Sequence, residues 1–385
     1  MTLMGRRELL AEARKQYWRA GKKEKTRILD EFLRYTGYHR KYALALLKGR
    51  YSHHKATTRR RKRRYTQEVT DTLVFIWTVC DHIASRRLHP FLPEMITVLE
   101  RQGTLQLTDA TRQLLLTISR PTMDRLLQPA RRARVPHGRT TTKPGTLLKQ
   151  AIPIRTWADW DDAKPGYLEI DLAAHCGEST EGEYLATLDC VDVCSGWCEC
   201  IVPANRGEQA VLTALEQVRD RLPMPLLGVD SDNGGEFINK YLLHYCLSEH
   251  LVFTRSRPYK KNDQAHVEEK NWMVVRRHVG YDRYAGDAAR VALNHLYQDL
   301  RLYVNFFQPV MKLVEKTRVD GKVKKVYDAA QTPYQRLQAS PDVSQERKDA
   351  LTALYQTLDP VALYQTIQTQ LAKIWERYSN APIAK

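Results

Sequence analysis

The sequence lacks any apolar run long enough to cross a bilayer, which takes about 20 consecutive apolar residues. Its first 18 residues also lack the apolar centre of a secretory signal peptide. The seven cysteines are an odd number, which fits a reducing compartment better than a disulfide framework. We therefore expect a cytoplasmic protein with no membrane partner, and 385 residues leave room for two or three domains.

A zinc-binding pattern is missing as well. Four cysteines fall within eleven residues, namely Cys190, Cys194, Cys198 and Cys200. Structural zinc sites use cysteine pairs about two to four residues apart and set in turns, whereas these four lie in or beside apolar, strand-like segments. Cysteine is also a good small core residue. We predict that these side chains pack in the core.

Acidic residues are few relative to basic ones. There are 44 Asp and Glu against 61 Lys and Arg, which gives a formal charge of +17 and a pI near 9.5. Such a balance implies a polyanionic partner. The densest basic run is Arg59, Arg60, Arg61, Lys62, Arg63 and Arg64, and a second group is Arg120, Arg125, Arg131, Arg132, Arg134 and Arg139. Because the first run joins two helical units, whereas a basic run alone is usually a solvated linker, we expect it to track double-stranded DNA. The second group flanks a helical segment.

Residues 1–50 are predicted to form a helix-turn-helix unit. Helices are indicated at 6–20, 22–34 and 39–47, with a glycine-containing turn at 36–38. In this motif the helix after the turn enters the major groove. The expected exposed readers are Thr36, Tyr38, His39, Arg40 and Lys41, while Tyr42, Leu44 and Leu47 are expected to pack.

A second helical, helix-turn-helix-like unit is predicted at residues 65–130. It has an apolar helix at 69–84, a helix at 109–116 and another at 121–127, with Ser119 as N-cap and Pro121 in the first turn. The proline, glycine and threonine content of 128–155 is typical of an extended linker. We assign 131–158 to that linker.

Three acids on three predicted elements carry the chemistry. Asp232 begins an Asp-Asn-Gly turn, and 35 residues separate it from Glu268. Asp171 lies in an apolar, strand-like run at 167–172. An acid has no structural reason to lie in such a run unless its side chain faces a ligand. Carboxylate oxygens are the hard ligands that Mg²⁺ prefers, and two-metal phosphodiester chemistry requires two or three of them together. The trio predicts metal-dependent cutting and joining of DNA.

Neighbouring acids compete for two of these places. Asp230 could replace Asp232, but the Asn-Gly that follows Asp232 supplies a turn that aims its side chain. Glu269 points about 100° away from Glu268 on a helix, so only one of them faces the site. Glu268 shares a face with Trp272, and we favour it. Asp189 and Asp192 lie late in the second predicted strand of the core, and we interpret them as strand-end or turn acids.

These residues resemble the DDE group of insertion-sequence transposases, whose catalytic core is of the retroviral integrase type within the ribonuclease-H-like superfamily. The resemblance covers about residues 160–310, and residues 262–268 are similar to the family's segment before the third acid. Asp171, Asp232 and Glu268 fall on the family's three acids, and the family pattern favours Asp171 over Glu169 on the same strand face. The chain departs from retroviral integrases at His53 and His54, which have no cysteine pair to complete a zinc module.

The resemblance implies a transposase that binds the terminal repeats of a mobile element, frees a 3′-OH by hydrolysis and joins it to target DNA. It further implies two Mg²⁺ ions, replaceable by Mn²⁺, on the three acids, and a homo-oligomer on DNA in the bacterial nucleoid. The alternative is a catalytically inactive DNA-binding regulator or target adaptor derived from a transposase. Basic residues near the core are further candidates for DNA contact: Lys260, Lys261, His266, Lys270, Arg276 and Arg277.

The expected fold class is multidomain: all-α helix-turn-helix units, a central α/β ribonuclease-H-like integrase core at 159–308, and a C-terminal hairpin with helices at 309–385. Within the core we predict strands at 167–173, 184–191, 197–202, 226–229 and 251–254, and helices at 207–221 and 265–279. A hairpin is predicted at 311–327 around Asp320-Gly321, followed by helices at 344–358 and 360–378. Their apolar residues are expected to form a small separate core or a surface for another protomer.

Overall fold

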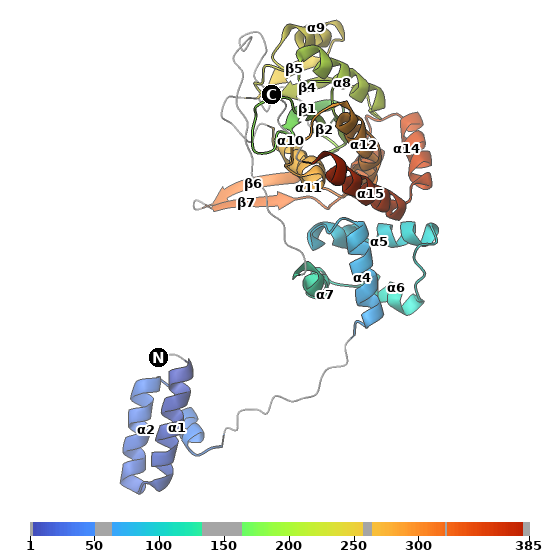
Figure 1. Ribbon diagram of the computed structural model, residues 1–385. Helices are drawn as coiled ribbons and strands as arrows, with labels where there is room; N and C mark the ends of the chain where they lie inside the picture. Colours follow the sequence, from blue (N-terminus) through green and yellow to red (C-terminus); the bar gives the residue numbers. More distant parts are fainter. Residues whose placement is uncertain (1–2, 51–63, 133–163, 257–263, 320–321, 380–385) are drawn as a thin grey trace. The chain divides into compact units, whose positions relative to one another are not determined.

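The computed structural model describes residues 3–50, 64–132, 164–256, 264–319 and 322–379 (Figure 1). The chain divides into two compact units, Met1–Thr66 and Gln67–Lys385. The predicted linker residues 133–158, the basic run 59–64 and the loop with Lys260 and Lys261 lie outside the described residues.

The first unit is built from three helices, α1 (Leu3–Arg19), α2 (Lys22–Thr36) and α3 (Arg40–Leu47). Gly37 ends α2 in the left-handed conformation, with φ of 69°, and its N–H donates to the carbonyl of Leu33. His39 begins α3 as its N-cap, accepting from the N–H of Lys41. Apolar side chains from all three helices form one core that includes Tyr17, Phe32 and Leu47. The predicted helix, glycine turn and helix are present.

Two of the expected side-chain placements in this unit are wrong. Thr36 is only 4% exposed, because its hydroxyl donates to the carbonyl of Phe32 at 2.6 Å. Tyr42, expected to pack, is 41% exposed, and Tyr38 is half-buried with its ring near Phe32. Of the predicted readers, His39, Arg40 and Lys41 are exposed.

The second unit begins with four helices, α4 (Gln67–Val79), α5 (Ser85–Arg101), α6 (Asp109–Leu116) and α7 (Arg120–Arg132). Helix α4 ends before residue 84, because Asp81 and His82 take left-handed φ values of 51° and 58°. The sequence did not predict α5, which contains Pro90 and Pro93 and buries Leu88, Phe91 and Met95. Its apolar face outweighs the two prolines.

Helix α7 corrects the start of the predicted linker. Arg131 and Arg132 are its last residues. Arg131 pairs with Asp124 at 2.7 Å, and its guanidinium lies over the ring of Trp77 at 5.7 Å. These contacts hold the end of α7 against α4, so this segment belongs to the helical region.

A five-stranded mixed sheet follows, consistent with the expected integrase-core-like arrangement. Its strands are β1 (Tyr167–Ala174), β2 (Ala186–Asp192), β3 (Cys198–Ile201), β4 (Gly228–Ser231) and β5 (Val252–Arg255). Their order is β3-β2-β1-β4-β5. Strands β1, β2 and β3 are antiparallel, whereas β4 runs parallel to β1 and β5 parallel to β4. The carboxyl end of β4, at Ser231, therefore lies beside Ile170 in the middle of β1, so Asp232 follows β4 next to the part of β1 that carries Asp171.

The edge strand β3 is capped by helix α12 (Asp287–Phe307). The side-chain amide of Asn305 accepts from Cys198 N–H at 2.9 Å and donates to its carbonyl at 2.8 Å. Asn294, three turns earlier, makes the same pair of bonds with Val202, at 2.8 and 3.0 Å. An exposed strand edge is a template for pairing with another chain. These two amides occupy that edge at both ends.

Further helices position the site. Helices α8 (Glu208–Arg221) and α9 (Lys240–Ser248) pack against β3 and β5, respectively. The expected helix 265–279 is continuous but has three parts: α10 (Ala265–Lys270), the π-helical η2 (Asn271–Arg276) and α11 (Arg277–Val279). Helix α10 packs against β1 and β2.

The C-terminal elements are the hairpin β6 (Leu313–Val319) and β7 (Lys322–Tyr327), then α13 (Pro333–Ala339), α14 (Gln345–Thr357) and α15 (Pro360–Tyr378). The ring of Tyr355 stacks on Tyr334 at 4.7 Å and on Phe306 at 6.1 Å. Helix α15 packs along α12 and contacts α4. These apolar residues therefore join the core of the second unit, and the expectation of a separate small core is wrong.

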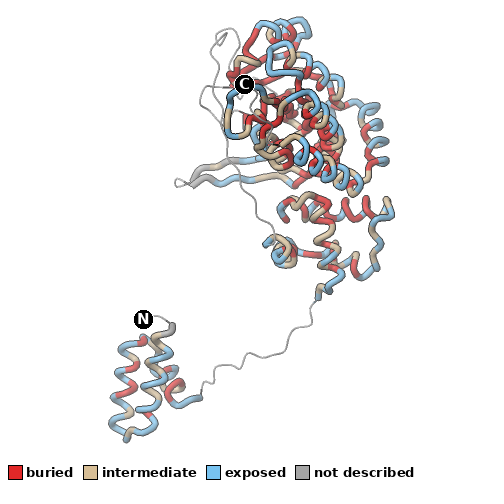
Figure 2. Tube along the Cα trace, viewed as in Figure 1, coloured by how far each residue is buried: buried red, intermediate tan, exposed pale blue. Residues whose placement is uncertain are grey.

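Figure 2 shows the buried residues concentrated in the sheet, in the helices against it and along one side of each N-terminal helix. Among the described residues no helix is both long and apolar enough to span a membrane.

Candidate active site

Asp171 is held on β1 by two hydrogen bonds. Its Oδ1 accepts from the N–H of Leu172 at 2.8 Å, and its Oδ2 accepts from the side-chain amide of Asn271. Burial, together with the negative charge of Asp232, raises the pKa of Asp171 to about 7. Like charges at one site disfavour ionisation, so the two carboxylates are close enough to repel each other.

Asp232 lies in a tight turn directly after β4. Its Oδ1 accepts from the N–H of Gly234 at 2.7 Å. A Cβ at Gly234 would lie 2.8 Å from Asp232 Oδ1 and 2.7 Å from the carboxyl carbon of Glu236. Burial raises the pKa of Glu236, and the charge of Asp232 adds to the effect. Glycine thus lets two carboxylates approach each other, and Glu236 lies in this turn, before the first turn of α9.

Glu268 is an exposed residue of α10. The Oε2 atom of Glu169 accepts from the N–H groups of His266 and Val267 at 2.9 and 3.0 Å, which fixes the start of this helix on β1. Asn271 follows Glu268 by three residues and so lies on the same helical face. Because Asn271 bonds to Asp171, that face of the helix is turned toward the first acid.

The competing acids have other surroundings. Asp230 is fully buried and accepts from the hydroxyl of Thr254 at 2.6 Å. Glu269 lies near Arg87 of α5, whose pKa is lowered by burial while the charge of Glu269 opposes the shift. Asp192 is a turn acid, as predicted, and accepts from the N–H groups of Gly166 and Ser195, each at 2.7 Å. None of these three contacts places a carboxylate beside Asp171.

A second polar cluster lies beside Asp171 on the neighbouring strand. It corrects the interpretation of Asp189 as a strand-end or turn acid, because Asp189 lies in the middle of β2. Asp189, the register partner of Asp171, accepts from the thiols of Cys198 and Cys200 at 3.2 and 3.5 Å. Ligand atoms of these three residues lie within 4.8 Å of one another, a metal-like grouping. Burial raises the pKa of Asp189 to about 6, a shift opposed by the Cys198 bond and the charge of Lys270. The buried Lys270 ammonium already supplies a positive charge there, which disfavours a metal ion.

Several basic side chains that were predicted to contact DNA are buried or bonded to other residues of the protein. Lys270 is only 4% exposed, so its prediction as a DNA-binding residue is wrong. Arg276 is half-buried and donates to the carbonyl of Ala174 at 2.8 Å, while Arg277 pairs with Asp81 at 3.0 Å. Arg120 and Arg125 of α7 are exposed.

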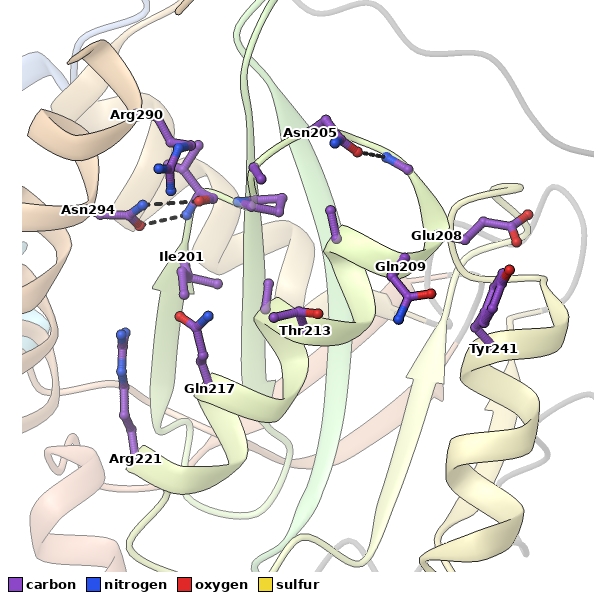
Figure 3. Close-up of a pocket in the computed structure, with 16 residues that line it drawn as sticks. Ile201, Asn205, Glu208, Gln209, Thr213, Gln217, Arg221, Tyr241, Arg290 and Asn294 are labelled. Atoms are coloured by element: carbon purple, nitrogen blue, oxygen red, sulfur yellow. Dashed lines mark hydrogen bonds between the residues drawn. The ribbon is translucent and has the colours of Figure 1, made fainter. Parts of the chain in front are cut away.

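A pocket of about 660 Å³ lies elsewhere, between the end of β3, one side of α8 and the first turns of α12 (Figure 3). Its polar lining includes Gln217, Arg221, Arg290 and Asn294, and Tyr241 of α9 stands at one end. The three predicted acids are not among the residues that line it.

Sequence reasoning missed two contributors to the site. Glu169 was weighed only as a competitor of Asp171, and Asn271 had no assigned contact with an acid. Glu236 was considered either as a support for Asp232 or as a first-turn acid of the next helix, and it lies beside Asp232 before that helix begins. Helix α10 begins without a side-chain cap of its own, which indicates that another residue accepts from its first N–H groups. Identifying that residue as Glu169 requires knowledge of how α10 packs against β1.

No model of a known protein family matches the chain. Among solved structures, the catalytic core domain of BIV integrase is similar, with 17% identity and a TM-score of 0.29, over 44% of this chain and 91% of that one. The HTLV-2 integrase catalytic core domain in complex with magnesium is similar too, with the same identity and TM-score, over 38% of this chain and 91% of that one.

A curated relative covers almost the whole chain. The uncharacterized protein y4rM of Sinorhizobium fredii (strain NBRC 101917 / NGR234) is 41% identical over 336 residues, which is 87% of this chain and 96% of that protein. The chain therefore belongs to the same protein family as y4rM.

Proposed function

We propose that this chain is a DNA transposase that cuts the ends of a mobile element and joins them to target DNA. The observation that carries the proposal is the hydrogen bond from Asn271 to Asp171, because it turns the Glu268 helix toward the first acid while Asp232 lies close enough to raise the pKa of that acid. Three carboxylates from β1, the β4 turn and α10 then face a common site.

The donor set fits Mg²⁺. Asp171, Asp232 and Glu268 offer hard oxygen ligands, which Mg²⁺ prefers to sulfur or nitrogen. The repulsion that raises the pKa of Asp171 would be relieved by a cation. Two such ions, when bound, would activate the attacking oxygen and stabilise the leaving oxygen of a phosphodiester. Mn²⁺ would serve as a substitute.

The chain's own residues prepare that site. Asn271 and the N–H of Leu172 fix both oxygens of Asp171, and the N–H of Gly234 fixes Oδ1 of Asp232. In the first reaction water attacks the phosphorus at the element end, and the bond to the 3′ oxygen breaks to leave a 3′-OH. In the second, that 3′-OH attacks the phosphorus of a target phosphodiester, and the bond to the target strand's 3′ oxygen breaks to leave a new 3′-OH in the target.

The helical regions are proposed to bind the terminal repeats. His39, Arg40 and Lys41 lie exposed at the start of α3, and Arg120 and Arg125 lie exposed on α7. A charge of +17 supports a DNA partner. Joining two ends requires at least two copies of the chain on DNA.

The test is a Mg²⁺-dependent cleavage and joining assay on labelled DNA that carries the repeats flanking the gene. Asp232→Asn and Glu268→Gln should lose both products while still binding the ends. Glu269→Gln is the matched control, because that neighbour lies near Arg87, and it should remain active. Specific binding with no cleavage in the wild type would favour a regulator or target adaptor, and cleavage without joining would favour a nuclease.

A further inference from the structure

Glu169 links the strand of the first acid to the helix of the third. It lies on β1 two residues before Asp171, so the two side chains are on the same face of the strand. It is 1% exposed. Its Oε2 accepts from the N–H groups of His266 and Val267 at 2.9 and 3.0 Å. These are the two residues that directly precede Glu268.

The start of α10 depends on this contact. The first N–H groups of a helix have no partner within the helix, and Gln264, the N-cap of α10, makes no side-chain capping bond. A carboxylate at a helix N-terminus is favoured by the helix dipole and makes charge-assisted hydrogen bonds. Glu169 therefore supplies, from the neighbouring strand, the cap that α10 lacks.

We propose that Glu169 is a positioning residue that sets the separation between the Asp171 and Glu268 carboxylates and thereby the affinity for the metal ions. The inference rests on the proposed function. One strand then controls two acids: Asp171 directly, and Glu268 through the first turn of its helix. Glu268 is the fourth residue of α10, so the position of the first turn sets the position of Glu268. A shift of Glu268 along β1 would separate the oxygens that must share a cation.

This role differs from that of a metal ligand. Oε2 of Glu169 is already engaged by two N–H groups, and the side chain is buried. It also differs from a general packing role, because its effect should be confined to the metal site. Partners that orient metal ligands typically change metal affinity about 10- to 100-fold when removed.

The experiment measures Mn²⁺ binding to the full-length protein by calorimetry, and amide hydrogen exchange over 264–271, for the wild type, Glu169→Gln and Glu169→Ala. Glutamine keeps one neutral acceptor oxygen, whereas alanine keeps none. We expect Mn²⁺ binding to weaken about tenfold in Glu169→Ala, with Glu169→Gln in between. Exchange at His266 and Val267 should become faster in the same order.

Glu199→Gln is the matched control. Glu199 is also fully buried in the sheet, and it accepts from Trp197 Nε1 at 2.9 Å and from Arg301 at 2.7 Å. Its loss should lower thermal stability and leave Mn²⁺ affinity unchanged. The conservative Glu169→Gln keeps the test valid if Glu169→Ala does not fold.

The outcomes separate the two proposals. Unchanged Mn²⁺ affinity in both folded Glu169 variants, or an equal loss in Glu199→Gln, would overturn the positioning role. If the wild type neither binds Mn²⁺ nor cleaves DNA, the proposed function fails. In that case unchanged exchange at His266 and Val267 in Glu169→Gln would overturn the capping role as well, and faster exchange would support it.

Discussion

Asn271 donates a hydrogen bond to Oδ2 of Asp171 across the face of the sheet. Asn271 is the first residue of the π-helical segment η2, which directly follows α10. A π turn takes more residues than an α turn and is frequent at functional sites. Here the π segment begins at Asn271, which contacts Asp171, and ends directly before Arg277, which contacts Asp81 at 3.0 Å.

Replacing Asn271 tests this relationship. Asn271→Ala should lower the rate of strand cleavage about 10- to 100-fold, because Asp171 would lose a donor that orients it, while DNA end binding should be unchanged. Asn294→Ala is the control, since it removes two bonds to β3 away from the acids. Equal rates for Asn271→Ala and the wild type in a single-turnover assay would show that the bond has no catalytic importance.

Asp171→Asn should stabilise the metal-free protein in a pH-dependent way. The pKa of Asp171 in the folded state is raised to about 7 by burial and by Asp232, above its value of about 4 in an unfolded chain. The folded protein favours the protonated form of Asp171. The wild type therefore has its full stability at low pH and loses part of it as the pH rises from about 4 through 7, because Asp171 must ionise in the folded state. The increase in melting temperature on substitution should be largest at pH 8 and smallest near pH 4. A gain independent of pH would contradict this account.

Gly234→Ala should disturb two carboxylates at once. A Cβ there would come within 2.8 Å of Asp232 Oδ1 and 2.7 Å of Glu236, so one of the side chains must move. We expect a stability loss of about 1–3 kcal/mol and a strong loss of Mg²⁺-dependent cleavage. Gly235→Ala is a matched control, because a Cβ at Gly235 meets nothing within 4 Å. Denaturant unfolding and the cleavage assay together distinguish the two variants.

The sheet could be predicted because its strands are short apolar runs separated by turn residues. Asp171 lies within such a run and Asp232 directly follows another, and in the structure the charge of Asp232 acts on Asp171. Helix α5 was missed because Pro90 and Pro93 interrupt the sequence pattern, although its buried face stabilises it. The end of α4 was misplaced because left-handed φ values at Asp81 and His82 have no signal in apolar periodicity.

Side-chain partners across the fold could not be predicted. Lys270 was assigned to DNA because a basic residue on a helix is usually exposed, but its position against β2 buries it near Asp189. The contact of Glu169 with His266 spans almost 100 residues of sequence. Such contacts depend on the packing of α10 against β1, which no local pattern specifies.

The link between Asp81 and Arg277 should contribute to stability at neutral pH. Burial by itself would raise the pKa of Asp81. The hydrogen bond with His82 and the charges of His278 and Arg277 outweigh burial, so the pKa of Asp81 is lowered. The contribution of Asp81 to the free energy of unfolding is therefore present above about pH 4, the pKa of Asp in the unfolded chain. It is lost as the pH falls through the pKa of Asp81 in the folded protein. Asp81→Asn should cost about 2 kcal/mol at pH 7 and less near pH 3. A double-mutant cycle with Arg277→Ala measures the coupling, and a coupling of zero would refute the link.

Lys41 provides a test of DNA binding by the first unit. It is exposed at the start of α3, where a helix that enters the major groove would meet phosphates. If Lys41 contacts one phosphate, Lys41→Ala should weaken binding to all sequences and reduce the slope of log K against log salt by about 1. Lys15→Ala is the control, because Lys15 lies on α1 and pairs with Glu12 at 3.3 Å. A salt dependence that is the same for both variants and the wild type would remove Lys41 from the proposed interface.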